Sequence, residues 1–316
     1  MSDAAANSGP VFNRITIIGA GLIGSSLARA IDRDEAVAML VLADADEATL
    51  TEAKSLELAG EYTSDLVKAV QNADLVVLAV PVGAMASVAV TMAPGLKPGA
   101  VITDVGSVKA SVVKALTPLL PGTVHLIPGH PVAGTEESGP SAGFASLFDD
   151  RWVILTPPEE KDGGADAGAL DKLSAFWTGL GANVDIMTPE HHDLVLAITS
   201  HVPHLIAYNI VGTASDMEEV TRSEVIKYSA GGFRDFTRIA ASDPTMWRDV
   251  FLNNKDAVLE MLGRFSEDLT ALQRAIRWGD GDALFELFTR TRGIRRRIID
   301  AGQDDATADF GRPHED

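Results

Sequence analysis

The sequence lacks cysteine, has few aromatic side chains and is poor in positive charge. Its 316 residues include no Cys, 3 Tyr and 4 Trp, and it carries 26 Lys and Arg against 45 Asp and Glu. Without cysteine there is no disulfide framework, no cysteine nucleophile and no thiolate-bound metal. The net charge of -19 argues against nucleic acid and against an anionic membrane surface as main partners.

Long apolar runs are also scarce. Residues 1–10 are small and polar and lack the apolar core of a signal peptide. We expect no apolar run of membrane-spanning length and no membrane partner, so a cytoplasmic location is favoured. Hydrophobic residues still make up 46% of the chain, which is enough for a large core and, at this length, for two domains.

The most informative stretch runs from Arg14 to Ser25 and reads RITIIGAGLIGS. It joins a short apolar run, three glycines at the spacing G-x-G-x-x-G and the start of a helical period. Gly19 permits a tight turn, Gly21 lets a pyrophosphate approach the backbone, and Gly24 lets the helix lie close to the sheet. The free N–H groups at the helix start favour phosphate, so the stretch predicts a dinucleotide site.

A second apolar run, at 39–43, is followed by Asp44, twenty positions after Gly24. A carboxylate here can accept hydrogen bonds from an adenosine ribose and would repel a 2′-phosphate, which favours NAD over NADP. The alternative is a glycine turn of another α/β protein, with Asp44 capping a helix. For Val80 and Pro81, a simple strand end is an equally good explanation. The candidate cofactor contacts are Gly19, Gly21, Leu22, Ile23, Gly24, Asp44, Val80 and Pro81.

The first half of the chain alternates apolar runs with helical periods. This order predicts an α/β fold, a Rossmann-like, doubly wound parallel sheet with helices on both faces. The expected strands are 15–18, 40–43, 75–80, 100–103, 123–127, 153–155 and 184–187. The expected helices are 22–32, 46–56, 66–72, 83–92, 108–119 and 171–178.

The pattern becomes purely helical at Thr188. This residue is a good N-cap, and Pro189 and Glu190 suit a first helical turn. We therefore expect a flexible tail at 1–10, a dinucleotide-binding domain at 11–187, an all-helical substrate and dimerisation domain at 188–301, and a flexible tail at 302–316. Apolar stripes in the helical domain suit a subunit interface, although an intrachain core explains them nearly as well.

The segment 128–136 reads PGHPVAGTE and is expected to be a loop after a strand. Loops at strand ends commonly fix functional side chains. His130, between Gly and Pro, can take a proton from a hydroxyl near neutral pH. The alternative is a structural histidine bonded to a backbone carbonyl. For Glu136, capping or ion pairing is as good an explanation as function.

A second histidine group, SHVPH at 200–204, lies within a helical pattern. His201 and His204 are three positions apart and share roughly one helix face. No carboxylate signature accompanies them, so we expect no metal. His191 and His192 are expected at an exposed helix start.

The segment 231–248 holds three arginines and a tryptophan. Arg234 and Arg238 are four positions apart and are expected to project from one helix face. Because arginine grips carboxylates with two parallel hydrogen bonds, this cluster suits an acidic substrate. Surface ion pairing is the alternative, and we prefer it for Arg248 but not for Arg238.

Taken in order, these motifs resemble the prephenate/arogenate (cyclohexadienyl) dehydrogenase family of tyrosine biosynthesis. They are the glycine fingerprint, DVGSVK at 104–109, GHPVAGTE at 129–136, SHVPH at 200–204, GFRDFTRIA at 232–240 and DPTMWR at 243–248. The resemblance implies a homodimer built through the helical domain. It also implies NAD-dependent oxidative decarboxylation of prephenate to 4-hydroxyphenylpyruvate, with hydride passing from C4 to NAD.

The resemblance implies roles for single residues as well. His130 would hydrogen-bond the C4 hydroxyl and accept its proton, and Ser107 would hold that hydroxyl and the histidine. Arg238 would bind the ring carboxylate, and His204 would lie near the substrate side chain.

Two further roles follow less tightly from the resemblance. Glu136 would be a gating or pH-sensing acid, and Trp247 would line the substrate pocket. Arogenate dehydrogenase and a dual-substrate cyclohexadienyl dehydrogenase remain alternatives. So do a β-hydroxyacid dehydrogenase, for which Lys255 is the nearest candidate lysine, and a non-catalytic NAD sensor.

Overall fold

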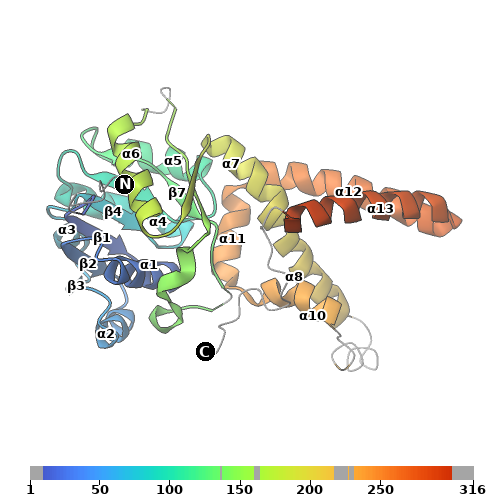
Figure 1. The fold of residues 1–316 in the computed structure, drawn as a ribbon, viewed down its shortest axis with the longest axis horizontal. Coiled ribbons are helices and arrows are strands. Elements are labelled where there is room, and N and C mark those ends of the chain that lie inside the picture. The colour runs from blue at the N-terminus through green and yellow to red at the C-terminus, as the bar shows by residue number, and fades with distance from the viewer. Residues whose placement is uncertain (1–9, 136, 160–163, 217–226, 228–230, 301–316) are drawn as a thin grey trace, which may run out of the picture. The chain divides into compact units, whose positions relative to one another are not determined.

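The computed structural model of the chain describes residues 10–135, 137–159, 164–216, 227 and 231–300 (Figure 1). These residues form two compact units, one that ends at Val258 and one that begins at Leu259. Glu136 and the expected tail at 302–316 lie outside the described residues.

The first unit contains a parallel six-stranded sheet of order β3-β2-β1-β4-β5-β6. Its strands are β1 (Arg14–Ile18), β2 (Met39–Ala43), β3 (Glu61–Thr63), β4 (Leu75–Leu78), β5 (Val101–Asp104) and β6 (His125–Leu126). The helices that alternate with them are α1 (Leu22–Arg33), α2 (Glu47–Ser55), α3 (Leu66–Ala69), α4 (Val82–Met92) and α5 (Ala110–Leu116). This order confirms the expected Rossmann-like architecture, and β3 is a strand that the apolar pattern did not indicate.

The sheet is buried on both faces because successive strand residues point into two separate cores. Ile17 and Leu42 belong to the core that also contains Leu27 of α1. Ile18 and Val41 belong to the core of the opposite face. Parallel strands covered in this way are apolar at nearly every position, which explains why the strands read as continuous hydrophobic runs.

A smaller second sheet follows, formed by β7 (Gly129–Pro131), β8 (Trp152–Leu155) and β9 (Asn183–Ile186), with α6 (Ala167–Gly179) between β8 and β9. The expectation that 128–136 is a loop is wrong for its first part. His130 pairs with Ile154 of the antiparallel strand β8, and Thr156 N–H donates to the Pro128 carbonyl at 2.8 Å. The tripeptide Gly-His-Pro becomes a strand through this long-range pairing, not through its own propensity.

From residue 188 on, every described element is helical. The elements are α7 (Pro189–Leu196), the π-helical turn η6 (Ala197–His201), α8 (Val202–Ser215), α10 (Gly231–Thr237), the 3₁₀ turn η7 (Arg238–Ala241), α11 (Pro244–Asn253), α12 (Lys255–Trp278) and α13 (Gly281–Asp300). Thr188 caps α7 by accepting from the N–H of His191, as expected. Asp243 caps α11 in the same way.

One expectation about apolar runs is wrong. The continuous helical segment Pro189–Ser215 has 27 residues and contains a stretch of 18 residues with a mean hydropathy of 1.5, so by length and composition alone it is able to cross a membrane. Core helices of soluble proteins pass the same test. This segment also carries His192 and Asp193, whose buried side chains are hydrogen-bonded to other parts of the first unit.

Candidate active site

The glycine loop between β1 and α1 has the geometry of a phosphate cradle. Gly19 has a φ of +105°, and a Cβ there would lie 2.4 Å from the Ala79 carbonyl oxygen. A Cβ on Gly24 would lie 1.9 Å from the carbonyl oxygen of Gly19, whereas one on Gly21 would meet nothing within 4 Å. Among the described residues, no side chain caps the start of α1. Open space beside free N–H groups is what a pyrophosphate needs.

Asp44 supports this loop directly. One carboxylate oxygen accepts from the N–H of Ala20 at 2.9 Å, and the other accepts from the N–H of Asp46 at 3.0 Å. Each carboxylate oxygen can accept a second hydrogen bond. The residue therefore holds the turn and the start of α2 in place, and it retains acceptor capacity for a ribose.

The remaining candidate cofactor contacts surround the loop. The Cγ1 atom of Val80 lies 3.1 Å from the place where a Cβ on Gly19 would be. Pro81 is exposed and directly precedes α4. Leu22 and Ile23 form the first turn of α1 and are half-buried.

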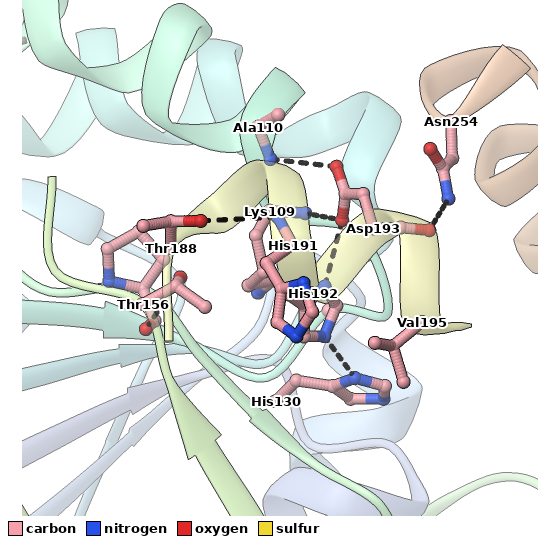
Figure 2. A network of polar contacts seen from close by, with 12 residues as sticks. Lys109, Ala110, His130, Thr156, Thr188, His191, His192, Asp193, Val195 and Asn254 are labelled. Atoms are coloured by element: carbon pink, nitrogen blue, oxygen red, sulfur yellow. Dashed lines mark hydrogen bonds and ion pairs between the residues drawn. The ribbon is translucent and has the colours of Figure 1, made fainter. Parts of the chain in front are cut away.

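His130 lies on β7 with 7% of its surface exposed. Its Nδ1 is 2.8 Å from Nε2 of His192, whose own Nδ1 is 2.8 Å from a carboxylate oxygen of Asp193 (Figure 2). Burial lowers the pKa of His130 well below its usual value of 6.5, and the ammonium of Lys109 lowers it further. The imidazole is therefore neutral at neutral pH and able to accept a proton.

His192 is fully buried, so the expectation that it lies at an exposed helix start is wrong. The cause is the neighbouring Asp193, whose carboxylate accepts from the backbone N–H groups of Lys109 at 2.8 Å and Ala110 at 2.9 Å (Figure 2). These bonds bring the first turn of α7 against the start of α5. Only His191 is exposed. An acid directly after a His pair was the signal available for Asp193, and sequence reasoning missed it.

Lys109 holds the strand that carries His130. Its Nζ donates to a carboxylate oxygen of Asp104 at 2.5 Å and to the carbonyl of Gly129 at 2.6 Å. Both charged side chains are fully buried. Burial lowers the pKa of Lys109, and the negative charge of Asp104 opposes that shift. The DVGSVK motif thus contains a buried ion pair that sequence reasoning passed over in favour of Ser107.

A second group of candidate residues surrounds His204. Its ring stacks on Trp247 with 3.6 Å between ring centroids, and its Nδ1 lies 2.8 Å from the Ser200 carbonyl. Since a carbonyl only accepts, Nδ1 carries the proton and Nε2 is the acceptor. Burial lowers the pKa of His204, the Ser200 carbonyl raises it, and the positive charge of Arg238 lowers it. Arg238 begins the turn η7, which packs against α8, the helix that carries His204.

His201 connects the two groups. It is fully buried at the end of the π-helical turn, and its Nδ1 is 3.1 Å from the amide nitrogen of Asn254. Burial lowers its pKa to about 4, whereas the carboxylate of Asp193 and the backbone of Ser107 raise it. The backbone of Ser107 therefore lies close to His201. π-helical turns often occur at functional sites.

Arg234 lies in α10, which ends at Thr237, and Arg238 begins the 3₁₀ turn that follows directly. The side chain of Arg234 is 70% exposed. Arg248 pairs with its neighbour Asp249 at 2.7 Å, which is the ion pairing expected for it.

Comparison with known proteins gives the family. The model described as prephenate dehydrogenase, nucleotide-binding domain, matches residues 27–186, and the model described as prephenate dehydrogenase, dimerization domain, matches residues 188–290. The chain is 47% identical to a cyclohexadienyl dehydrogenase of Zymomonas mobilis, over 90% of this chain and 96% of that protein. It is 32% identical to a prephenate dehydrogenase of Bacillus subtilis, over 89% of this chain and 75% of that protein.

Solved structures agree. The prephenate dehydrogenase of Aquifex aeolicus, in complex with hydroxyphenyl propionate and NAD+, matches with a TM-score of 0.83 and 32% identity, covering 90% of this chain and 98% of that one. An arogenate dehydrogenase of Synechocystis matches with a TM-score of 0.75 and 27% identity, covering 90% of this chain and 99% of that one. The chain is a dehydrogenase that belongs to the prephenate dehydrogenase family.

Proposed function

We propose that this chain catalyses the NAD-dependent oxidative decarboxylation of prephenate to 4-hydroxyphenylpyruvate, a step of tyrosine biosynthesis. The observation that carries the proposal is the buried imidazole of His130. A series of contacts through His192, Asp193, Asn254 and His201 joins it to the stacked rings of Trp247 and His204. Arg238 begins the turn η7, which packs against α8, the helix that carries His204. A hydroxyl has to lose a proton and a carboxylate has to be held, and these side chains suit both tasks.

NAD is the proposed hydride acceptor, and the glycine loop fits it. When bound, it supplies the nicotinamide ring to which the C4 hydrogen is transferred as hydride. The open space at Gly21 and the uncapped start of α1 suit its pyrophosphate. Asp44 suits the hydroxyls of its adenosine ribose and disfavours a 2′-phosphate.

The chain's own residues manage the proton and the carboxylates. His130 accepts the proton of the C4 hydroxyl, and Ser107 holds that hydroxyl. Arg238 positions the ring carboxylate without binding it so tightly that loss of carbon dioxide is opposed. His204, stacked on Trp247, faces the pyruvyl side chain in this proposal. We assign Glu136 a gating role by family resemblance only.

A second candidate is a dual-substrate enzyme that also accepts arogenate, in which an amino group replaces the side-chain keto group. The observation that favours it is the 47% identity to a protein named cyclohexadienyl dehydrogenase. An enzyme that does not discriminate at the side chain would treat both substrates alike.

The test is the formation of reduced cofactor in four reactions, prephenate or arogenate with NAD or NADP. Turnover of prephenate with NAD alone is the expected result. Turnover of both substrates would establish the dual-substrate enzyme, and arogenate alone would establish an arogenate dehydrogenase. Absence of turnover in all four would contradict the proposal and favour a β-hydroxyacid dehydrogenase or an NAD sensor.

The structure lends little support to these last alternatives. Lys255, the nearest candidate lysine of a β-hydroxyacid dehydrogenase, is exposed at the first position of α12. A sensor would leave the buried cluster around His130 without a task. In the part of the chain that the structure describes, no group of three or more His, Asp or Glu side chains is arranged to hold a metal ion.

We also propose that the enzyme is a homodimer in the cytoplasm. The model that matches residues 188–290 is described as a dimerization domain. Large apolar side chains of α12 and α13 support this, because they are strongly exposed in the single chain, Trp278 and Phe285 each at 72%. The location is proposed because the relatives named above are biosynthetic dehydrogenases.

A further inference from the structure

Two buried residues behind His130 have no task in the reaction as proposed so far. Asp193, His192 and His130 form a chain of hydrogen bonds, with 2.8 Å from Asp193 Oδ1 to His192 Nδ1 and 2.8 Å from His192 Nε2 to His130 Nδ1 (Figure 2). The exposed fractions of the three residues are 4%, 0% and 7%. Buried polar groups are nearly always hydrogen-bonded, and these bonds fix how the two rings are oriented.

Each carboxylate oxygen of Asp193 accepts a hydrogen bond from a backbone N–H group, Oδ1 from Lys109 and Oδ2 from Ala110. Burial raises the pKa of Asp193 above its usual value, although these N–H groups and the ammonium of Lys109 oppose the rise. Since each oxygen already accepts from a backbone N–H group, the geometry favours the ionised carboxylate, which has no proton to donate. The proton in its bond to His192 is therefore assigned to Nδ1 of that ring.

The remaining protons follow from this assignment. A neutral imidazole has one N–H and one lone pair. With its proton on Nδ1, His192 presents a lone pair at Nε2, so Nδ1 of His130 must be the donor between the two rings. Nε2 of His130 then carries the lone pair. That nitrogen is the one left free for a substrate hydroxyl.

We propose that His192 and Asp193 are positioning residues that hold His130 as the Nδ1–H tautomer, with Nε2 free to accept the substrate proton. The inference rests on the proposed function in that His130 is the base. The O–H bond of the substrate breaks, an N–H bond forms at Nε2, and the oxygen electron pair becomes part of a C=O bond as hydride leaves C4. The resulting imidazolium still donates through Nδ1 to His192, so no ring has to rotate.

Lys109 completes the arrangement from the backbone side. By donating to the Gly129 carbonyl at 2.6 Å, it fixes the residue before His130, while His192 fixes the ring. The direction of the ring depends on both. A catalytic group whose orientation is fixed in this way is more often in the orientation that reacts.

The direct test determines which ring nitrogen of His130 carries the proton. Protein labelled with ¹⁵N-histidine gives separate ring-nitrogen shifts for protonated and unprotonated positions, and the His130 signals are identified by their loss in His130→Gln. We expect a protonated Nδ1 and an unprotonated Nε2. A protonated Nε2 on His130 at neutral pH would overturn the proposal. This readout does not need turnover, so its failure is distinct from a failure of the proposed function in the four-reaction assay.

Two substitutions of His192 test whether it orients the His130 ring or only fills space. In His192→Gln, Oε1 can occupy the place of Nε2 and accept from His130. In His192→Asn, the shorter side chain can still reach Asp193 but offers His130 no acceptor. We expect kcat of the Gln variant within about tenfold of the unsubstituted enzyme, and a loss on the order of 100-fold for Asn with KM nearly unchanged.

The exposed His191→Asn is the matched control and should retain full activity. In His192→Asn the ¹⁵N pattern of His130 should shift toward the Nε2–H form. Equal kcat in the Gln and Asn variants, or an unaltered His130 tautomer in the Asn variant, would show that His192 only fills space.

Discussion

At the scale of residues, the site depends on imidazoles kept neutral by burial. Among the residues that the structure describes, no acid forms an ion pair with His130 or His201, and burial is the main cause of their lowered pKa values. Neutrality is required of a base that must accept a proton. The same burial makes these residues sensitive to acid and to substitution.

Replacing the base should stop turnover and spare cofactor binding. In His130→Gln the side chain can no longer take a proton, so kcat should fall by a factor on the order of 100 or more. NAD affinity, measured by quenching of protein fluorescence, should be nearly unchanged, since the glycine loop is untouched. His191→Gln is the control, and full activity in His130→Gln would remove His130 from the role of base.

Removing the cation should weaken substrate binding. A hydrogen bond to a charged group contributes about 1.5–3 kcal/mol, so Arg238→Ala should raise KM on the order of 10- to 100-fold. Arg234→Ala, whose side chain is 70% exposed, should leave KM unchanged. Steady-state kinetics at varied prephenate concentrations measure KM for each variant. Equal KM values in both variants would exclude Arg238 from the site.

Acid should destabilise the fold through His201. Its pKa is about 4 in the folded chain and about 6.5 in an unfolded one. Between these values the unfolded chain binds more protons, so the free energy of unfolding falls as pH drops from about 6.5 toward about 4. The slope is at most about 1.4 kcal/mol per pH unit for this group. Urea unfolding of the enzyme and of His201→Gln should show a shallower slope in the variant, and parallel slopes would contradict the lowered pKa.

At the scale of elements, two glycines at the start of α1, Gly21 and Gly24, have different roles. A Cβ on Gly24 would collide with the backbone of Gly19, while a Cβ on Gly21 would point into open space. Gly24 therefore allows α1 to pack closely against β1. Gly21 leaves open space beside the loop.

The two glycines should respond differently to alanine. Gly24→Ala forces the helix away and should lower stability by about 1–3 kcal/mol. Gly21→Ala should change stability by less than about 1 kcal/mol but weaken NAD binding. Thermal unfolding together with NAD titration tests this. A Gly21→Ala variant that binds NAD normally would contradict the proposed position of the pyrophosphate.

Much of this architecture is readable from the sequence because its signals are local. The run from β1 to α1, the end of β2 at Asp44 and the start of α7 at Thr188 each carry their own pattern of apolar, glycine or capping residues. The strand β7 carries none, since it exists only through pairing with β8. The burial of His192 likewise depends on Asp193 bonding to Lys109, 84 positions away in the sequence, and no local pattern records such a contact.

At the scale of the whole molecule, the helices of the unit that begins at Leu259 expose large apolar side chains, among them Ile276 at 67%, Trp278 at 72%, Phe285 at 72% and Phe288 at 57%. Exposed apolar surface of this extent marks an interaction site. Burying such surface against a second copy is the simplest way to stabilise it.

The mass in solution should reflect this pairing. Light scattering after size exclusion should give about twice the 33.4 kDa of one chain. Phe285→Glu should shift the protein toward the monomer by placing a charge in the interface. Val90→Glu on α4, also exposed at 57%, should not. A monomer at all concentrations for the unsubstituted chain would contradict the proposed dimer.

The two bonds made by Asp44 have a consequence for anyone who redesigns cofactor choice. Exchanging this acid for a neutral or basic side chain would be the obvious route toward a phosphorylated dinucleotide. The same exchange would leave the N–H groups of Ala20 and Asp46 without their acceptors, and so loosen the loop that any dinucleotide must bind. An asparagine keeps one acceptor oxygen. A specificity switch built on Asp44→Asn, with a cation introduced nearby, should therefore retain more activity than one built on Asp44→Ala or Asp44→Arg.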